Sequence, residues 1–209
     1  MGTPPGYRET QELMDGPHLA RTLARIAHEI AERHPDAGET VLVGILSRGL
    51  PLARRLAALV KAAGAGEPRV GALDISLYRD DFTAVAPNPL MRGTHIPVSI
   101  DGRTVIVVDD VLYTGRTARA ALDELIDFGR PARIELAIVV DRGHRELPIH
   151  ADYVGHPLTT SKDEIVQVLL GEEDGQDRVV VYAKERGSAR ARRSRSLPAR
   201  SKKPARRKR

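Results

Sequence analysis

The chain of 209 residues contains no cysteine. A disulfide framework, a cysteine-based metal site and a cysteine nucleophile are therefore excluded. No apolar run approaches the roughly 18–20 residues that a membrane-spanning helix needs, and no signal peptide is recognisable at the start of the chain. These two absences predict a soluble cytoplasmic protein without a membrane segment.

Several common motifs are also missing. The sequence has neither the G-x-x-x-x-G-K-[ST] of nucleoside-triphosphate P-loops nor the G-x-G-x-x-G of dinucleotide-binding folds. Its seven histidines show no H-E-x-x-H or similar ligand spacing. The protein is therefore not expected to hold a metal ion through its own side chains. A divalent ion such as Mg²⁺ would arrive with a substrate, bound mainly by phosphate oxygens and water.

Acidic residues are absent from positions 186–209, which hold 12 of the 33 lysine and arginine residues. The preceding 185 residues carry 21 basic and 28 acidic residues, a net charge of −7. The 186–209 segment has almost no apolar residues and is expected to be disordered. It would either attract polyanions through counterion release or serve only as a solubilising extension.

The strongest functional signal lies in residues 103–119. The β-branched run 105–108 predicts a buried parallel strand, and Asp109 and Asp110 stand where that strand ends. Residues 114–117, Thr-Gly-Arg-Thr, then lead into an amphipathic helix. A turn of this kind exposes backbone N–H groups at the positive end of the helix dipole, an arrangement that favours a phosphate.

The paired acids indicate what else the ligand contains. Carboxylates repel an anion, so Asp109 and Asp110 are expected to face a different part of the ligand. Adjacent ribose hydroxyls can donate hydrogen bonds to ionised oxygens, and a phosphate at one end with a diol at the other describes a ribose 5-phosphate. The simpler alternative is an ordinary strand–turn–helix whose acids cap or solvate the turn. The coincidence of a buried strand, paired acids and a Thr-Gly-x-Thr turn favours the ribose phosphate.

Residues 108–117, Val-Asp-Asp-Val-Leu-Tyr-Thr-Gly-Arg-Thr, resemble the signature of the type I phosphoribosyltransferases. Their wording is most similar to the PyrR family, pyrimidine-operon regulators that also act as uracil phosphoribosyltransferases, and the resemblance covers about residues 20–182. It implies an α/β fold, with a mostly parallel central sheet, helices on both faces and a small hood. The expected organisation is a flexible arm at 1–14, a phosphoribosyltransferase domain at 15–185 with a lid at about 79–100 and a hood at about 141–185, and a disordered basic tail at 186–209.

Three further segments complete the expected site. A second buried strand at 39–46 ends in Ser47-Arg48-Gly49, where a guanidinium fork suits a polyphosphate, and the family has a pyrophosphate-binding loop here. The long, proline-interrupted segment 82–100 has the character of a lid, with Arg92 as its cation toward pyrophosphate. Segment 141–148 follows another buried strand, and in the family it forms part of the hood over uracil.

Catalytic roles are expected at Asp109, Asp110 and Arg48. Substrate contacts are expected at Ser47, Arg48, Arg92, Asp109, Asp110, Val111, Leu112, Tyr113, Thr114, Gly115, Arg116, Thr117 and Arg142, and at Val166 through its backbone.

A helix is expected from residue 15 to about 33, with a capping acid and a proline in its first turn. Arg21, Arg25 and His28 share one face of it. This face is either an ordinary solvated surface or, as the resemblance implies, part of a basic surface that binds RNA, to which Arg145 would add.

Departures from the family weaken the RNA interpretation. His150 and His156 stand where relatives usually carry arginine and lysine, and Ala24 replaces a threonine. A histidine is mostly neutral at pH 7 and is a poorer phosphate partner. The sequence therefore supports catalysis more firmly than sequence-specific RNA recognition.

The expected reaction joins uracil to phosphoribosyl pyrophosphate and yields uridine monophosphate and pyrophosphate. The second expected activity is that of a uridine-nucleotide-sensing, RNA-binding regulator of pyrimidine biosynthesis genes, acting on an mRNA leader. The alternatives are an RNA-binding regulator with vestigial catalysis and a phosphoribosyltransferase for another base, such as a purine. A homo-oligomer, dimeric or larger, is also expected.

Overall fold

The computed structural model describes residues 2–77 and 93–185. The elements follow one another as β1 (Tyr7–Met14), α1 (Gly16–Arg33), β2 (Thr40–Ile45), α2 (Gly49–Ala62), β3 (Arg69–Leu73), β4 (Thr104–Leu112), α3 (Arg116–Phe128), β5 (Arg133–Asp141), β6 (Tyr153–Pro157), β7 (Glu164–Leu169), α4 (Gly171–Asp174) and β8 (Arg178–Lys184), with short 3-10 turns at Ala37–Glu39 and Ile75–Leu77.

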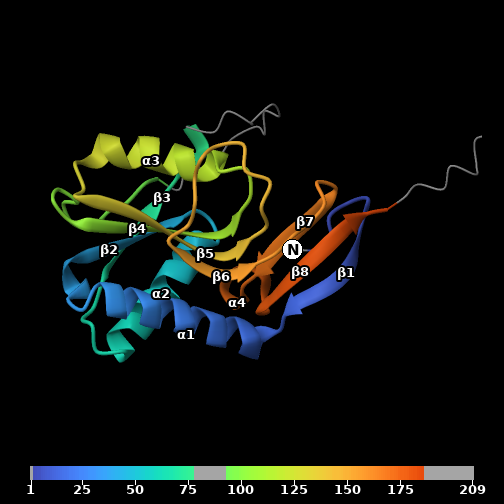
Figure 1. Ribbon diagram of the computed structural model, residues 1–209, viewed down its shortest axis with the longest axis horizontal. Coiled ribbons are helices and arrows are strands. Elements are labelled where there is room, and N and C mark those ends of the chain that lie inside the picture. The colour runs from blue at the N-terminus through green and yellow to red at the C-terminus, as the bar shows by residue number, and fades with distance from the viewer. Residues whose placement is uncertain (1, 78–92, 186–209) are drawn as a thin grey trace, which may run out of the picture.

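Five of these strands form the main sheet, in the order β3-β2-β4-β5-β6. All four neighbouring pairs are parallel. Helices α1 and α2 cover one face and α3 covers the other (Figure 1). Because both faces are covered, the inner strands are continuous apolar runs, and every residue of β2 is buried. The predicted α/β fold is confirmed, although β6 at the sheet edge was not expected.

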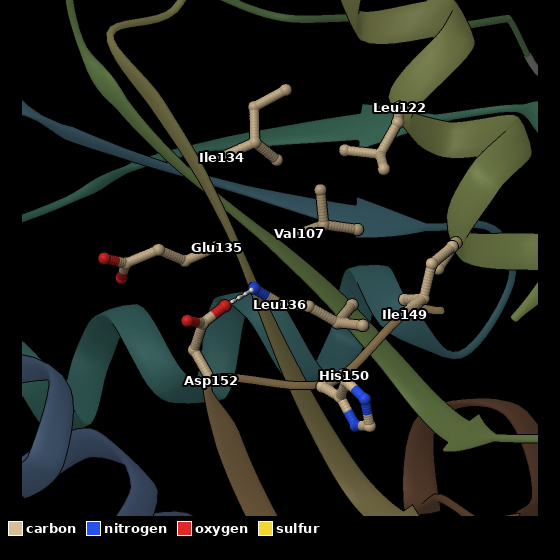
Figure 2. Close-up of a pocket in the computed structure, with 9 residues that line it drawn as sticks. Val107, Leu122, Ile134, Glu135, Leu136, Ile149, His150 and Asp152 are labelled. Carbon is tan, nitrogen blue, oxygen red and sulfur yellow. Dashed lines mark hydrogen bonds between the residues drawn. The ribbon is translucent and has the colours of Figure 1, made fainter. Parts of the chain in front are cut away.

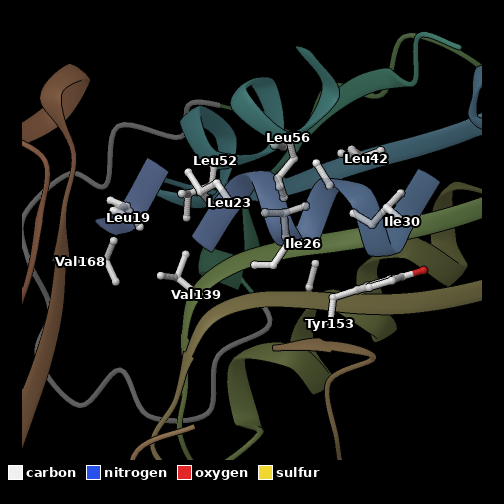
Figure 3. Close-up of a cluster of buried hydrophobic side chains, with 14 of the residues drawn as sticks. Leu19, Leu23, Ile26, Ile30, Leu42, Leu52, Leu56, Val139, Tyr153 and Val168 are labelled. Atoms are coloured by element: carbon white, nitrogen blue, oxygen red, sulfur yellow. The ribbon is translucent and has the colours of Figure 1, made fainter. Parts of the chain in front are cut away.

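Helix α1 starts as its sequence predicts. The Asp15 carboxylate caps it by accepting a 2.8 Å hydrogen bond from the His18 N–H, and a proline lies in the first turn. Its apolar stripe packs against α2 and the main sheet, as Figure 3 shows. The large side chains in this cluster include Leu19, Leu23, Ile26, Ile30, Leu52, Leu56 and Tyr153. Truncating one of these, such as Ile26, to alanine is expected to cost about 2–5 kcal/mol.

The remaining strands form a second, antiparallel sheet in the order β1-β8-β7. The prediction of a loose arm over 1–14 is wrong for Tyr7–Met14, which pairs along β8. This strand is held in place in two ways: Met14 is buried in the core, with 1% of its surface exposed, and Glu9 and Glu12 form ion pairs with Arg178 of β8. The predicted hood boundary also changes, because β1 joins β7 and β8 while β6 belongs to the main sheet.

Strand β3 ends at Leu73. The Asp74 carboxylate accepts hydrogen bonds from the backbone N–H and the hydroxyl of Ser76, and this local turn diverts the chain from the sheet. Residues 79–92 of the predicted lid lie outside the described residues. His95 exchanges backbone hydrogen bonds of 2.8 and 2.9 Å with Ala72 of β3, and Ile100 is buried. The predicted lid boundary at 100 is therefore wrong.

The predicted basic tail, 186–209, also lies outside the described residues. Among the helices of the described segments, none combines the length and apolar character that crossing a membrane requires.

Candidate functional site

Two glycines bring the start of α2 against the sheet. A Cβ atom added at Gly44 of β2 would lie 2.4 Å from the Gly49 carbonyl oxygen, and one added at Gly49 would lie 2.3 Å from the Val108 carbonyl oxygen. Only glycine at both positions permits this approach. The loop at Ser47 and Arg48 consequently lies beside the carboxyl end of β4.

A cavity of about 230 Å³ opens where β2 and β4 end. It gathers the predicted loop arginine, the acid pair and the threonine at the start of α3, which lie far apart in the sequence. The lining residues are Ile45, Leu46, Ser47, Arg48, Ile75, Asp109, Asp110, Val111 and Thr117. The structure thus brings together residues from two of the predicted site segments.

Backbone groups orient both carboxylates of the acid pair. Asp109 Oδ1 accepts a hydrogen bond of 2.9 Å from the Asp110 N–H, and Asp110 Oδ1 accepts one of 2.8 Å from the Val111 N–H. Burial raises the pKa of the Asp110 carboxyl, and the positive charge of Arg48 opposes that rise. The pair is therefore oriented within the cavity, with the loop arginine as an electrostatic neighbour.

The turn from β4 into α3 encloses a second cavity of about 100 Å³, lined by Asp109 and residues 111–117. Gly115 is the N-cap residue of α3 and has a φ of +91°, a left-handed conformation that favours glycine. Gly115 has no side chain to cap the helix, and only a long 3.4 Å hydrogen bond joins the Arg116 N–H to Thr114 Oγ1. The first N–H groups of α3 lie at the positive end of the helix dipole. The two cavities adjoin, because Asp109, Val111 and Thr117 line both. An anion site thus lies next to the acid pair.

Arg142, predicted near the base, is buried between this turn and the following loop. Its Nε donates to Thr160 Oγ1 at 3.1 Å and its Nη2 donates to the Ser161 carbonyl at 3.0 Å. Its guanidinium carbon lies 4.1 Å from the centroid of the Tyr113 ring, a cation–π contact. Burial lowers the pKa of Arg142. Since Tyr113 lines the second cavity, Arg142 is placed directly behind that wall.

Arg145 holds the same loop in shape. Its guanidinium donates to the Tyr113 carbonyl at 2.6 Å and to the Ile149 carbonyl at 3.0 Å, and it pairs with Asp141 at 2.5 Å. Its side chain is only 16% exposed. This inward position argues against the RNA contact predicted for Arg145.

The comparisons with known proteins agree with this geometry. The family model described as phosphoribosyl transferase domain matches residues 9–170. The bifunctional protein PyrR of Thermus aquaticus is 55% identical over 174 residues, which cover 83% of this chain and 96% of the relative. That of Bacillus cereus (strain B4264) is 52% identical over 179 residues, which cover 85% and 99%. The chain belongs to the PyrR family.

Solved structures extend the likeness of this PyrR-family chain to more distant enzymes. A hypoxanthine-guanine phosphoribosyltransferase of Bacillus anthracis has a TM-score of 0.62 at 20% identity, covering 83% of this chain and 98% of its own. A hypoxanthine phosphoribosyltransferase of Trypanosoma cruzi has a TM-score of 0.63 at 17% identity, covering 85% and 98%. At such identities the likeness shows the fold alone, which is that of the type I phosphoribosyltransferases.

The α1 face predicted to bind RNA lies beside β6 in this PyrR-family chain. Arg25 forms an ion pair with Glu29 and also donates to the carbonyls of Val154 and Gly155, at 3.0 and 2.5 Å. His28 is exposed, and its Nδ1 lies 3.1 Å from the carbonyl oxygen of Ala24. Arg21 is exposed as well.

Some predicted contacts are not assembled at the two cavities. Arg92 lies outside the described residues. Val166 is 7% exposed in the middle of β7, and neither cavity has it in its lining. Leu112 and Arg116 do line the second cavity, but Leu112 also packs in the core and Arg116 forms a 2.9 Å ion pair with Glu146.

One residue at the site was missed by sequence reasoning. Asp174, on the four-residue helix α4, bonds the guanidinium of Arg48. In the sequence it belongs to Gly-Glu-Glu-Asp-Gly, which is typical of a polar turn. No local signal reveals a partner 126 residues away.

A further hollow, of about 90 Å³, lies between α3 and β5 on the opposite face of the main sheet from α1 (Figure 2). Apolar side chains, including Val107, Leu122 and Leu136, form much of its wall, and Asp152 accepts a hydrogen bond from the Leu136 N–H at its rim. It contains none of the predicted substrate contacts. We therefore assign the substrate to the two cavities at β4, which hold the predicted loop arginine, acid pair and turn.

Proposed function

We propose that the two adjoining cavities bind phosphoribosyl pyrophosphate, with its 5-phosphate at the start of α3 and its pyrophosphate at Arg48. As a member of the PyrR family, the protein is a uracil phosphoribosyltransferase and a regulator of pyrimidine biosynthesis. The observation that carries the assignment is that Asp109 and Thr117 line both cavities. One ligand can therefore meet an anion site, a carboxylate pair and an arginine at once.

In the proposed complex, the N–H groups of the β4–α3 turn hold the 5-phosphate. Asp109 and Asp110 accept hydrogen bonds from the ribose hydroxyls, and these charge-assisted bonds fix the position of the anomeric carbon. The bond from that carbon to pyrophosphate breaks as the bond to uracil N1 forms, and the N1 proton is released. The ribosyl ring gains positive charge in the transition state. The two nearby carboxylates stabilise that charge, while Arg48 stabilises the leaving pyrophosphate.

The donor set is compatible with a magnesium ion that accompanies the substrate. Within residues 2–77 and 93–185, no three histidine, aspartate or glutamate side chains converge as a metal cage. Asp109 and Asp110 are the carboxylates that would meet such an ion at the cavity. When bound, it neutralises pyrophosphate charge, with its other ligands supplied by phosphate oxygens and water.

We assign base recognition to the wall formed by Tyr113 and Arg142. Uracil offers two carbonyl acceptors, which backbone N–H groups of the turn can satisfy, while Arg142, which lines neither cavity, would hold the Tyr113 ring against the base. The contacts of Arg142 with Thr160 and Ser161 keep it in place behind Tyr113. Arg92 would add a cation to pyrophosphate, and the backbone of Val166 remains a proposed contact.

For regulation, we propose that uridine monophosphate in the same site modulates binding of an mRNA leader at the α1 face. The surface comprises Arg21, Arg25 and His28, without Arg145. The proposed substrates and RNA place the protein in the cytoplasm, and a dimer or larger homo-oligomer belongs to the same proposal.

The decisive experiment measures pyrophosphate release from phosphoribosyl pyrophosphate with uracil, cytosine, hypoxanthine or guanine, and without any base. Release that depends on uracil and exceeds that with the other bases by at least about 100-fold is expected, because the site's polar groups match one base. Equal turnover with a purine would overturn the uracil assignment. Pyrophosphate release at the same rate with and without a base would mean that the protein only hydrolyses phosphoribosyl pyrophosphate.

A further inference from the structure

Asp174, on α4 between β7 and β8 of the second sheet, bonds the arginine of the proposed pyrophosphate site. Its Oδ2 accepts a hydrogen bond from Arg48 Nε at 3.2 Å, and its Oδ1 accepts one from Arg48 Nη2 at 3.0 Å. This is a side-on, two-point pairing, which fixes the plane of a guanidinium as well as its position. The two side chains are 3% and 20% exposed, for Asp174 and Arg48 respectively. The pair is therefore shielded from water, unlike most surface ion pairs.

The carboxylate of Asp174 is itself oriented. The Leu170 N–H donates to its Oδ2 at 3.0 Å. Burial would raise the pKa of the Asp174 carboxyl, but the bonds from Arg48 and Leu170 hold it below its ordinary value. Asp174 is thus a charged, ordered acceptor at neutral pH, anchored to the end of β7.

Arg48 connects this anchor to the cavity that contains the acid pair. Arg48 lines the 230 Å³ cavity together with Asp109 and Asp110, and its charge opposes the burial-induced rise in the pKa of Asp110. Asp174 bonds the Nε–Nη2 edge of the fork, which fixes the plane of the guanidinium that lines the cavity. An arginine side chain has about 2 kcal/mol of rotamer entropy to lose, and an existing partner removes part of that loss before the ligand arrives.

We propose that Asp174 is a positioning residue for pyrophosphate binding: it orients Arg48 and makes the second sheet a functional part of the site. The proposal rests on the proposed role of Arg48 as a pyrophosphate contact. It predicts that removing the charge of Asp174 weakens binding of phosphoribosyl pyrophosphate while leaving uridine monophosphate, which has no pyrophosphate, little affected.

A merely structural role for Asp174 is the competing explanation, and the chain offers a matched control. Asp177 also links the second sheet to α2, by two bonds of 2.8 Å to Arg55, and its Oδ1 accepts a hydrogen bond from the Gly171 N–H. Neither Asp177 nor Arg55 lines either cavity. Asp177→Asn therefore removes the same charge from the same segment without touching the site.

The test compares wild type, Asp174→Asn, Asp174→Glu and Asp177→Asn as full-length proteins. We expect Asp174→Asn to raise the KM for phosphoribosyl pyrophosphate about tenfold, and Asp174→Glu to restore part of the loss. Asp177→Asn should lower the thermal midpoint but leave that KM within about twofold of the wild type, because Arg55 is outside the site. Changes confined to thermal stability in both asparagine variants would overturn the proposal.

A double-mutant cycle shows whether Asp174 acts through Arg48. Arg48→Lys keeps a charge but lacks the fork, so adding Asp174→Asn to it should cause no further loss in KM. An unchanged tenfold effect in that background would mean that Asp174 acts independently, which contradicts the proposal.

A calorimetric titration with inorganic pyrophosphate and Mg²⁺ separates this inference from the proposed function. If the wild type binds pyrophosphate but transfers nothing to uracil, the enzymatic proposal fails, and a tenfold weaker affinity in Asp174→Asn still supports the positioning role. If uracil turnover is intact and both asparagine variants bind pyrophosphate like the wild type, only the positioning role fails.

Discussion

The β4–α3 cradle, which comprises Asp109, Asp110 and the turn at 111–117, and the α1 face are both candidate sites for anionic ligands. The two sites are built differently. At the cradle, backbone N–H groups orient Asp109 and Asp110, and Gly115 exposes the helix N-terminus. On α1, the side chain of Arg25 is bonded to Glu29 and to two carbonyls of β6. The cradle therefore obtains its geometry from the fold itself, whereas the α1 face depends on side chains, of which Arg25 and His28 already have partners. Catalysis should respond sharply to changes in charge, and RNA binding only gradually.

The largest expected effect comes from neutralising the acid pair. Replacing Asp109 and Asp110 together with asparagine keeps their shape but removes two charge-assisted acceptors, each worth about 1.5–3 kcal/mol. We expect kcat/KM to fall by at least about 100-fold. Burial raises the pKa of the Asp110 carboxyl in the folded protein. Above the pKa that this carboxyl has in the unfolded chain, its ionisation therefore disfavours folding. Replacing it with the neutral asparagine is thus not expected to lower the free energy of unfolding.

Steady-state kinetics and thermal unfolding check this expectation. Asp123→Asn is the control, because Asp123 pairs with Arg119 on the exposed side of α3, away from both cavities. That variant should keep full turnover. Unchanged turnover in the double asparagine variant would refute the assignment of the ribose hydroxyls to these acids.

A second variant tests the predicted lid. Arg92 lies outside the described residues, so its role is a prediction from the sequence. Arg92→Ala should weaken binding of phosphoribosyl pyrophosphate by about 10–100-fold and that of uridine monophosphate much less, since a charge-assisted bond to pyrophosphate is worth about 1.5–3 kcal/mol. Equilibrium titration with each ligand decides, and equal losses for both would contradict a pyrophosphate contact.

The cradle was predictable because its pattern is local. A buried strand, two acids, a glycine turn and an amphipathic helix follow one another within residues 105–128, and the structure confirms that succession in β4 and α3. The same applies to α1, because Asp15 and the apolar stripe that follows it predict the helix. Roles assigned to individual cradle residues remain predictions, since geometry alone does not show the ligand.

Features that depend on distant partners were not predictable. Strand β1 has mostly exposed side chains, and its identity as a strand depends on pairing with β8, some 170 residues later. The bond between Arg48 and Asp174 spans 126 residues, and the inward position of Arg145 depends on carbonyls of two separate loops. Local sequence patterns carry no information about such pairings, because either partner alone resembles an ordinary polar surface residue.

The basic tail gives a smaller and different expected effect. Twelve cationic residues and no acids at 186–209 should attract RNA through counterion release, whatever its sequence. Removing residues 188–209 should weaken binding of leader RNA and scrambled RNA alike by about tenfold at low salt, and flatten the salt dependence, while uracil turnover stays intact. Titrations of both proteins at two salt concentrations measure this. Equal affinity before and after truncation would leave the tail without a role in RNA binding.

The smallest expected effect is on sequence preference at the α1 face. Because the guanidinium of Arg25 is already bonded to Glu29 and to the Val154 and Gly155 carbonyls, an RNA group would compete with these partners. Arg25→Ala should therefore reduce the preference for leader RNA over scrambled RNA by only about threefold, less than the roughly 1–3 kcal/mol typical of a dedicated base contact. Arg54→Ala, at an exposed position of α2, removes the same charge elsewhere and should weaken both RNAs equally. Measured in a protein ending at residue 187, with and without uridine monophosphate, the two variants separate specific from general attraction. A preference that is absent in the parent protein under both conditions would remove RNA regulation from the proposed function and leave the enzyme.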